Sequence, residues 1–157
     1  WSDEAAKFKF DELFAADAQL LGRKTYEGFA AAWPTMTDEG GFSDRMNAMP
    51  KYVVSTTLKT AGWNNSHLIQ SNVVEEIAKL RDAPGRDILL AGSGQLLRTL
   101  LEHNLVDELR LMLHPIVLGK GAKLFKDGLG TRVWKLSNTQ VFNSGIVVLH
   151  YVPAPSE

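Results

Sequence analysis

Three short segments of this sequence combine glycine, hydroxyl and basic residues in a way that suits the binding of phosphate groups. They are residues 21–25 (Leu-Gly-Arg-Lys-Thr), 54–57 (Val-Ser-Thr-Thr) and 91–95 (Ala-Gly-Ser-Gly-Gln). Each follows an apolar run, which is typical of a buried strand that ends at the edge of its sheet. In open α/β sheets, that carboxyl edge is where ligands bind. Together the three segments predict a site for a nucleotide cofactor.

The first segment carries the most specific chemistry. Gly22 permits close approach of a ligand, and the Arg23 guanidinium can hold a phosphate through two hydrogen bonds. Lys24 adds a point charge, and the hydroxyl of Thr25 suits the N-cap of a helix. The alternative interpretation is a solvated basic turn with an ordinary threonine N-cap.

The other two segments are less specific when each is taken alone. Residues 92–94 (Gly-Ser-Gly) stand where an apolar strand turns into a helix, so that backbone N–H groups can approach a pyrophosphate. Leu97 occupies the place of the third glycine of the dinucleotide fingerprint, which argues against the standard Rossmann fold. Residues 55–57 offer hydroxyls for a further phosphate, but they also fit local hydrogen bonds at a strand end.

The elements that must position these segments follow from the apolar pattern. Strands are predicted at 18–21, 51–55, 67–69, 88–91 and 109–113, with a final antiparallel hairpin at 134–142 and 146–151. Helical spacing lies between the strands up to about residue 114, and strands alone follow. This order predicts an α/β domain with a mostly parallel sheet that ends in antiparallel strands.

The composition bounds the function classes. The chain has 157 residues, 45% of them hydrophobic, which suits one globular domain over residues 1–157. Its net charge of −1 gives no basic footprint for nucleic acid or an anionic membrane, and no apolar run is long enough to span a bilayer. The chain has no cysteine, which excludes thiolate chemistry and fits a cytoplasmic protein, and its four histidines lack the paired spacing of a metal site.

Taken together, the motifs resemble the dihydrofolate reductase superfamily. The closer resemblance is to the branch that contains the C-terminal reductase domain of the bifunctional riboflavin-biosynthesis deaminase-reductase. It is carried by residues 21–27, 53–57 and 88–97 and by the later segments 106–109, 115–121 and 124–125, in the family's order. It implies an α/β sheet of about eight strands with helices on both faces, NADPH as cofactor, and hydride transfer to a small pterin-like or aminopyrimidine-like substrate. It also implies a homodimer, for which the apolar hairpin after Trp134 offers a surface.

By position, the resemblance assigns the cofactor site to three groups of residues and leaves the catalytic residue unknown. The three groups are Gly22, Arg23, Lys24 and Thr25 for the phosphates, Ser55, Thr56 and Thr57 for the adenosine 2′-phosphate, and Gly92, Ser93, Gly94, Gln95 and Leu96 for the pyrophosphate.

Two features depart from the family pattern. The family begins with a strand that ends in a Ser-Leu-Asp-Gly type motif beside the nicotinamide, and none occurs before Trp1. Since loss of a buried central strand would leave two rows of backbone groups unpaired, we expect residues upstream of Trp1 to supply it; otherwise the sheet lacks that strand. An ungapped count puts Ala6 in place of the acidic residue that contacts the pterin in dihydrofolate reductases, with Asp3, Glu4 and Asp11 nearby. Reduction of folate is therefore not expected.

The leading hypothesis is an NADPH-dependent reductase of a small molecule other than dihydrofolate. One alternative is the 5-amino-6-(5-phosphoribosylamino)uracil reductase of riboflavin biosynthesis, although the sequence shows no deaminase partner domain. Another is a non-catalytic nucleotide-binding module, and a third is a structural or interaction domain without a nucleotide site.

Overall fold

The computed structural model describes residues 2–155, so Trp1 and residues 156–157 lie outside it. Its strands are β1 (Ala16–Gly22), β2 (Lys51–Val54), β3 (Ser66–Ile69), β4 (Asp87–Leu90), β5 (Leu109–Leu113), β6 (Trp134–Val141) and β7 (Val147–Pro153). Its helices are α1 (Asp3–Phe14), α2 (Arg23–Ala32), α3 (Phe42–Ala48), α4 (Val73–Asp82) and α5 (Gly94–Glu102), with a 3-10 turn at Trp33–Thr35. Within the described range, no helix has the length and apolar character needed to cross a membrane.

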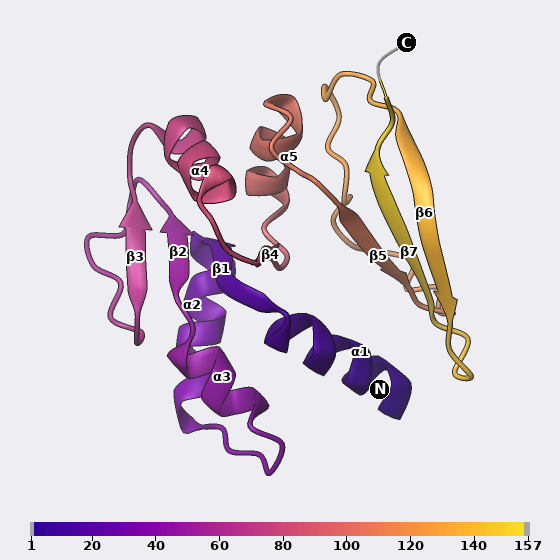
Figure 1. Cartoon of the computed structure of the whole chain (residues 1–157), viewed down its shortest axis with the longest axis horizontal. Coiled ribbons are helices and arrows are strands. Elements are labelled where there is room, and N and C mark those ends of the chain that lie inside the picture. The colour runs from indigo at the N-terminus through magenta and orange to yellow at the C-terminus, as the bar shows by residue number, and fades with distance from the viewer. Residues whose placement is uncertain (1, 156–157) are drawn as a thin grey trace.

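The strands form two sheets. A parallel sheet has the order β3-β2-β1-β4, and an antiparallel sheet has the order β5-β7-β6. In Figure 1 the parallel sheet lies on the left and the antiparallel sheet on the right, with α1 and α5 between them. The predicted α/β class and final hairpin are confirmed, but the prediction of one sheet of about eight strands is wrong for residues 2–155, which form seven strands. Strand β4 is the edge of the parallel sheet and β5 is the edge of the antiparallel sheet, and the two strands are not hydrogen-bonded to each other.

Helices α1 and α2 differ at their N-termini. The Ser2 hydroxyl caps α1 by accepting a hydrogen bond from the N–H of Ala5 at 3.2 Å. The N-cap of helix α2 is Gly22, three residues before the predicted cap Thr25. Thr25 therefore lies in the first turn of the helix. Its hydroxyl is then free to bond to a different segment of the chain.

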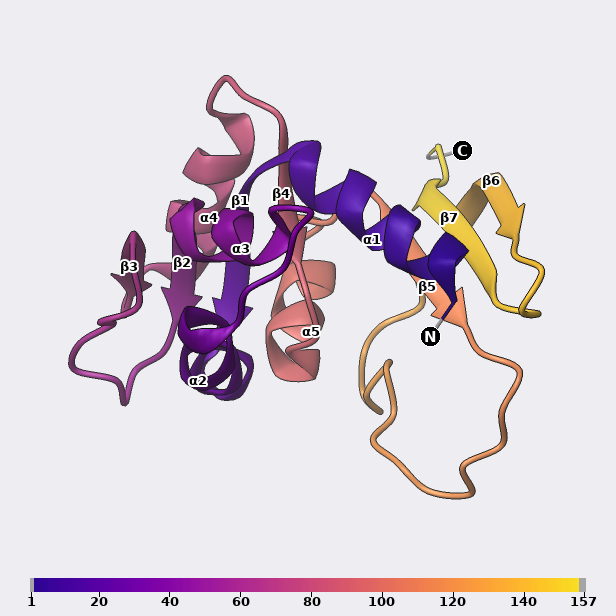
Figure 2. The same cartoon turned by 90° about the horizontal axis from the view of Figure 1, so that it is seen from below.

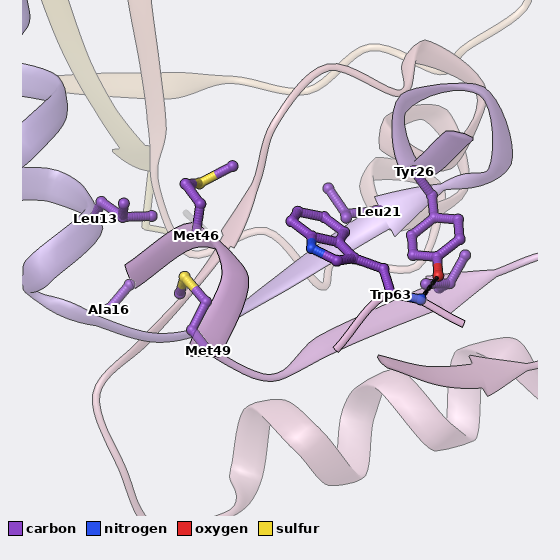
Figure 3. Packing of buried hydrophobic residues seen from close by; sticks show 8 residues of the cluster. Leu13, Ala16, Leu21, Tyr26, Met46, Met49 and Trp63 are labelled. Carbon is purple, nitrogen blue, oxygen red and sulfur yellow. Dashed lines mark hydrogen bonds between the residues drawn. The ribbon is translucent and has the colours of Figure 1, made fainter. Parts of the chain in front are cut away.

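Helices cover both faces of the parallel sheet, as predicted. Side chains alternate across β1, so Leu21 packs with the helices α1, α2 and α3, while Leu20 packs with α4 and α5. Figure 3 shows the first of these two layers, which includes Leu13, Leu21, Met46, Met49 and Trp63. The hydroxyl of Tyr26 accepts a hydrogen bond from the N–H of Trp63 at 3.0 Å and ties α2 to the loop before β3.

The antiparallel sheet is also covered on two sides. Phe142 and Val148 pack against Ala5 of α1, and Leu109 packs against Leu97 of α5. Residues 114–133 join β5 to β6 without a helix or strand, and Figure 2 shows this long loop extending away from both sheets. Helices α1 and α5 therefore pack the antiparallel sheet against the rest of the domain.

Candidate functional site

The three predicted phosphate-binding segments meet at one edge of the parallel sheet. Strands β2, β1 and β4 are adjacent and parallel, so their carboxyl ends share that edge. Gly22 ends β1, Ser55 follows β2, and residues 91–93 follow β4. The tertiary structure thus brings together Gly22, Ser55 and residue 91, each more than 30 positions from the next in the sequence.

Ser93 connects two of these segments directly. Its hydroxyl accepts a hydrogen bond from the N–H of Gly22 at 2.9 Å and donates one to the hydroxyl of Thr25 at 3.1 Å. Gly22 is the N-cap of α2, and Ser93 is the N-cap of α5. The bonds therefore hold the N-termini of two helices side by side.

Two glycines make this close approach possible. A Cβ atom at Gly22 would lie 2.9 Å from the Ser93 hydroxyl oxygen, which is too close for a side chain. Gly92 has a φ of +67°, in the left-handed region that favours glycine, and its added Cβ would lie 3.2 Å from the Thr25 hydroxyl. The absence of a side chain at each position leaves room for the hydroxyls of Ser93 and Thr25 between the two helix ends.

The helix N-termini supply N–H donors. Neither of the two N-cap residues, Gly22 and Ser93, makes a side-chain hydrogen bond to the first turn of its helix. The first N–H groups of a helix have no partner within the helix, and the helix dipole adds partial positive charge there. The paired ends of α2 and α5 are therefore suited to an anion with several oxygen atoms.

The third segment contributes through Arg23. Its guanidinium donates a hydrogen bond to the hydroxyl of Thr57 at 3.1 Å, and it lies 3.9 Å from the carboxylate of Glu27. The Ser55 hydroxyl is buried and accepts hydrogen bonds from the N–H groups of Thr57 and Leu58. Ser55 thus shapes the turn, while Arg23 and Thr57 are the exposed groups available to a ligand.

The remaining predicted residues differ in exposure. Lys24, Thr56 and Gln95 are exposed near the same edge. Leu96 is 7% exposed and packs into the core beneath α5, so only its backbone can face a ligand. The cofactor-binding roles assigned to these residues stay predictions.

The sequence analysis missed Lys126. It lies in the long loop between β5 and β6, and a Cβ built at Gly94 would be 3.4 Å from its Cε and 3.8 Å from its Nζ. The lysine therefore brings a positive charge to the N-terminus of α5. The sequence feature that could have indicated this lysine is the repetition of lysine at positions 120, 123 and 126 in a glycine-containing loop.

A groove separates the two sheets next to this edge. We call it the inter-sheet groove; its volume is about 1040 Å³, and it is lined by β4, by β5 and by parts of α1, α5 and the loop at 122–126. The α1 carboxylate in it is Glu12, which the sequence analysis did not consider; its carboxylate pairs with Arg110 of β5 at 3.3 Å. Arg110 also pairs with Asp87, the first residue of β4, so these charges lie at the opposite end of the strand from residues 91–93.

Comparison with known proteins gives a family and a fold. A family model described as RibD C-terminal domain matches residues 1–148. The uncharacterized protein YyaP of Bacillus subtilis (strain 168) is 37% identical over 144 residues, which cover 90% of this chain and 76% of that protein. A putative riboflavin biosynthesis protein from Shewanella sp. PV-4 has a TM-score of 0.72 at 20% identity, covering 91% of this chain and 77% of that one. A pyrimidine reductase-like protein from Corynebacterium diphtheriae has a TM-score of 0.66 at 14% identity, covering 99% of this chain and 83% of that one.

Proposed function

The chain belongs to the RibD C-terminal domain family, and from this and the geometry of its edge we propose that it is an NADPH-dependent reductase. Its substrate is a small heterocycle of the aminopyrimidine or pterin type. The observation that carries the proposal is the hydrogen-bonded bridge from Gly22 through Ser93 to Thr25. This bridge aligns two helix N-termini beside Arg23, which is an arrangement suited to a dinucleotide with several phosphate groups.

The residues at the edge fit the phosphates of NADPH in size and charge. Gly22 and Gly92 carry no side chain, which lets the two helix ends approach closely around the hydroxyls of Ser93 and Thr25. Arg23 and Lys24 supply positive charge from the first turn of α2, and Lys126 supplies it from the loop between β5 and β6. When bound, NADPH supplies the hydride that reduces the substrate.

Within this proposal, Arg23 and Thr57 bind the 2′-phosphate that distinguishes NADPH from NADH. The hydrogen bond between them holds the guanidinium over the end of β2. Ser55 keeps the turn in place from beneath. Gly92, Ser93 and Gly94 bind the pyrophosphate through N–H groups at the start of α5.

The substrate enters at the mouth of the inter-sheet groove, between the start of α5 and the loop at 122–126. The carboxylates that line the groove lie at the other end, where β4 and β5 begin; they are Glu12, Asp87, Asp107 and Glu108. A strand of four residues is roughly 13 Å long, which puts these groups out of reach of a substrate at the mouth. The proton that accompanies the hydride then comes from solvent or from the substrate itself.

A binding titration tests the cofactor. NADPH and NADH are each titrated into the protein while tryptophan fluorescence is followed, for the native chain and for Arg23→Gln. We expect the substitution to weaken NADPH binding at least tenfold more than NADH binding. Arg98→Gln on α5, whose guanidinium pairs with Glu102, is the charge-matched control. An equal loss for both nucleotides would remove the 2′-phosphate role from Arg23, and no binding of either nucleotide would overturn the proposal.

If NADPH binds, turnover decides between an enzyme and a binding module. NADPH oxidation is measured with reducible pterins and with aminopyrimidines, including 5-amino-6-(5-phosphoribosylamino)uracil. Oxidation that depends on one of these compounds supports the reductase. Tight binding without oxidation for the whole set favours the non-catalytic module.

A further inference from the structure

Gln19 is a polar side chain at the centre of a core strand. It is the middle residue of β1, lies on the same face of the sheet as Leu21, and is 2% exposed. Its Nε2 donates hydrogen bonds to the sulfur atoms of Met46 and Met49, at 3.1 and 3.2 Å. Its Oε1 has no hydrogen-bond partner among residues 2–155. Since thioether sulfur is a weak acceptor, the burial of this carboxamide is poorly compensated.

The two sulfur atoms fix the orientation of the carboxamide. A thioether accepts hydrogen bonds and cannot donate them, so the amide nitrogen faces Met46 and Met49 and the oxygen points away from them. Figure 3 shows both methionines in the core layer that also contains Leu13. Gln19 lines the inter-sheet groove as well. The unpaired oxygen is therefore the polar atom that Gln19 presents to the groove.

Aromatic side chains surround this part of the groove. Phe29, Trp33 and Phe42 line it, are partly exposed, and pack in the same core layer as Met46. The ring centres of Trp33 and Phe42 lie 5.3 Å apart. We call this part the Gln19 pocket; its lining consists of Leu13, Phe29, Trp33, Phe42 and Met46 around Gln19. Apolar and aromatic walls with one fixed polar atom are the usual composition of a site for a small molecule.

We propose that the Gln19 pocket takes the ring system of the substrate and that the Gln19 Oε1 accepts a hydrogen bond from an amino group on that ring. This assignment rests on the proposed function, from which the heterocycle of the aminopyrimidine or pterin type is taken. The aromatic and thioether side chains contact the faces of the ring. The oxygen selects a ring that carries an amino donor, because a carbonyl or alkyl group at the same place would leave the buried oxygen unpaired.

The position of Gln19 along the sheet fits a ring that is reduced at the mouth of the groove. Gln19 is in register with Leu89 of β4, which lies two residues before Ala91. Two strand residues span roughly 7 Å, which is comparable to the length of a bicyclic heterocycle. One end of such a ring can therefore bond to Gln19 while its other end lies at the mouth. Asp87 is two residues farther along β4, so the carboxylates of the groove lie beyond the ring.

Two pteridines that differ only in their hydrogen-bond donors test the assignment. 2,4-Diaminopteridine and 2,4-dimethylpteridine are titrated by calorimetry, without NADPH, into the native protein and into Gln19→Met, which keeps the side-chain length but lacks the oxygen. We expect the native protein to bind the diamino compound more tightly by about tenfold or more, and the variant to keep less than about threefold of this preference. Gln19→Leu repeats the measurement with a branched side chain. An equal preference in native and variant proteins would overturn the proposal, and so would its absence from the native protein.

A matched control and thermal unfolding separate recognition from folding. Gln140→Met removes a carboxamide from β6, where its nitrogen lies 3.2 Å from the Nε2 of His150, and should leave the preference unchanged. Because Gln19→Met removes a poorly paired buried amide, we expect it to raise the Tm by about 2–4 °C. A lower Tm with an equal loss of affinity for both pteridines would assign the carboxamide to the fold and overturn the proposal.

NADPH binding separates this proposal from the proposed function. Gln19 lies three residues, roughly 10 Å, before Gly22 along β1, so Gln19→Met should bind NADPH as the native protein does. A parallel loss of NADPH affinity would overturn the selective role of Gln19. If the native protein binds diaminopteridine but not NADPH, the reductase is rejected and the Gln19 pocket is supported. Binding of NADPH without any binding of diaminopteridine rejects the pocket alone.

Discussion

The hydroxyl of Ser93 accepts a hydrogen bond at 2.9 Å from the N–H of Gly22, which lies 71 residues earlier in the chain. This one contact fixes the spacing between the N-termini of α2 and α5. Ser93 holds this position with a φ of +60°, which is a costly conformation for a residue other than glycine. The backbone strain and the contact therefore occur at the same residue, next to the proposed pyrophosphate site.

Substitution of Ser93 separates the contact from the strain. Ser93→Ala removes the hydrogen bonds to Gly22 and Thr25 and keeps the strain, so we expect the free energy of unfolding to fall by about 1–2 kcal/mol. Ser93→Gly removes the same two bonds but relieves the strain, so we expect a loss about 1 kcal/mol smaller. Urea unfolding measures both, with Ser71→Ala at an exposed site as the control. NADPH binding should weaken in both variants of Ser93, and unchanged binding in both would show that the bridge does not shape the site.

Gly22, the N-cap of α2, and Gly28 within that helix should respond in opposite directions to substitution by alanine. At Gly22 the backbone φ of −78° is open to any residue, but the new Cβ would meet the Ser93 hydroxyl at 2.9 Å. We expect Gly22→Ala to lower the free energy of unfolding by about 1–3 kcal/mol and to weaken NADPH binding. At Gly28 nothing lies within 4 Å, so Gly28→Ala should raise stability by about 0.5–1 kcal/mol through helix propensity. Thermal unfolding measures the pair, and a loss at both positions would contradict the steric explanation.

Lys126 should contribute to nucleotide binding from the loop. Its amine lies close to Gly94 at the start of α5, so removal of its charge weakens the attraction for a bound phosphate. We expect Lys126→Gln to raise the Kd for NADPH by about three- to tenfold, which corresponds to roughly 0.7–1.4 kcal/mol. The difference should shrink at high salt because the site is open to solvent. Lys135→Gln on β6 removes the same charge far from the edge, and an equal effect there would mean that only net charge matters.

Burial of Lys51 should make stability depend on pH in the alkaline range. This side chain is fully buried, and its amine donates hydrogen bonds to the carbonyl groups of Asn47 and Asn64 and lies 4.0 Å from the Trp63 ring centre. Burial lowers the pKa of Lys51 to about 8, from 10.5 in the unfolded chain. Between these values the unfolded chain binds more protons than the folded protein. The free energy of unfolding should therefore rise as the pH increases from about 8 to about 10.5.

The size of this rise is on the order of 2–3 kcal/mol, since one pKa unit corresponds to about 1.4 kcal/mol. Urea unfolding at a series of pH values measures it. Lys51→Met removes the titrating group, so the variant should be less stable at pH 7 but should show a flatter alkaline profile. An identical profile in the two proteins would assign the pH dependence to another group.

The amino-acid sequence by itself determined the elements and the edge at which they act. Apolar runs that stop at Gly22, Ser55 and Gly92 predict the strands to within about two residues, because strand and helix periodicity are local properties of the chain. The convergence of those three positions also follows from the sequence, since parallel strands carry their carboxyl ends to a common edge.

Only the tertiary structure decided which side chains meet. The bond from Gly22 to Ser93, the approach of Lys126 to Gly94 and the burial of Lys51 all join positions whose contact depends on how the elements pack. The separation of β4 from β5 is of the same kind, because strand pairing is a long-range contact that no local pattern encodes. Periodicity reports which face of an element is buried, whereas the geometry of a site depends on the distances between elements that are far apart in the chain.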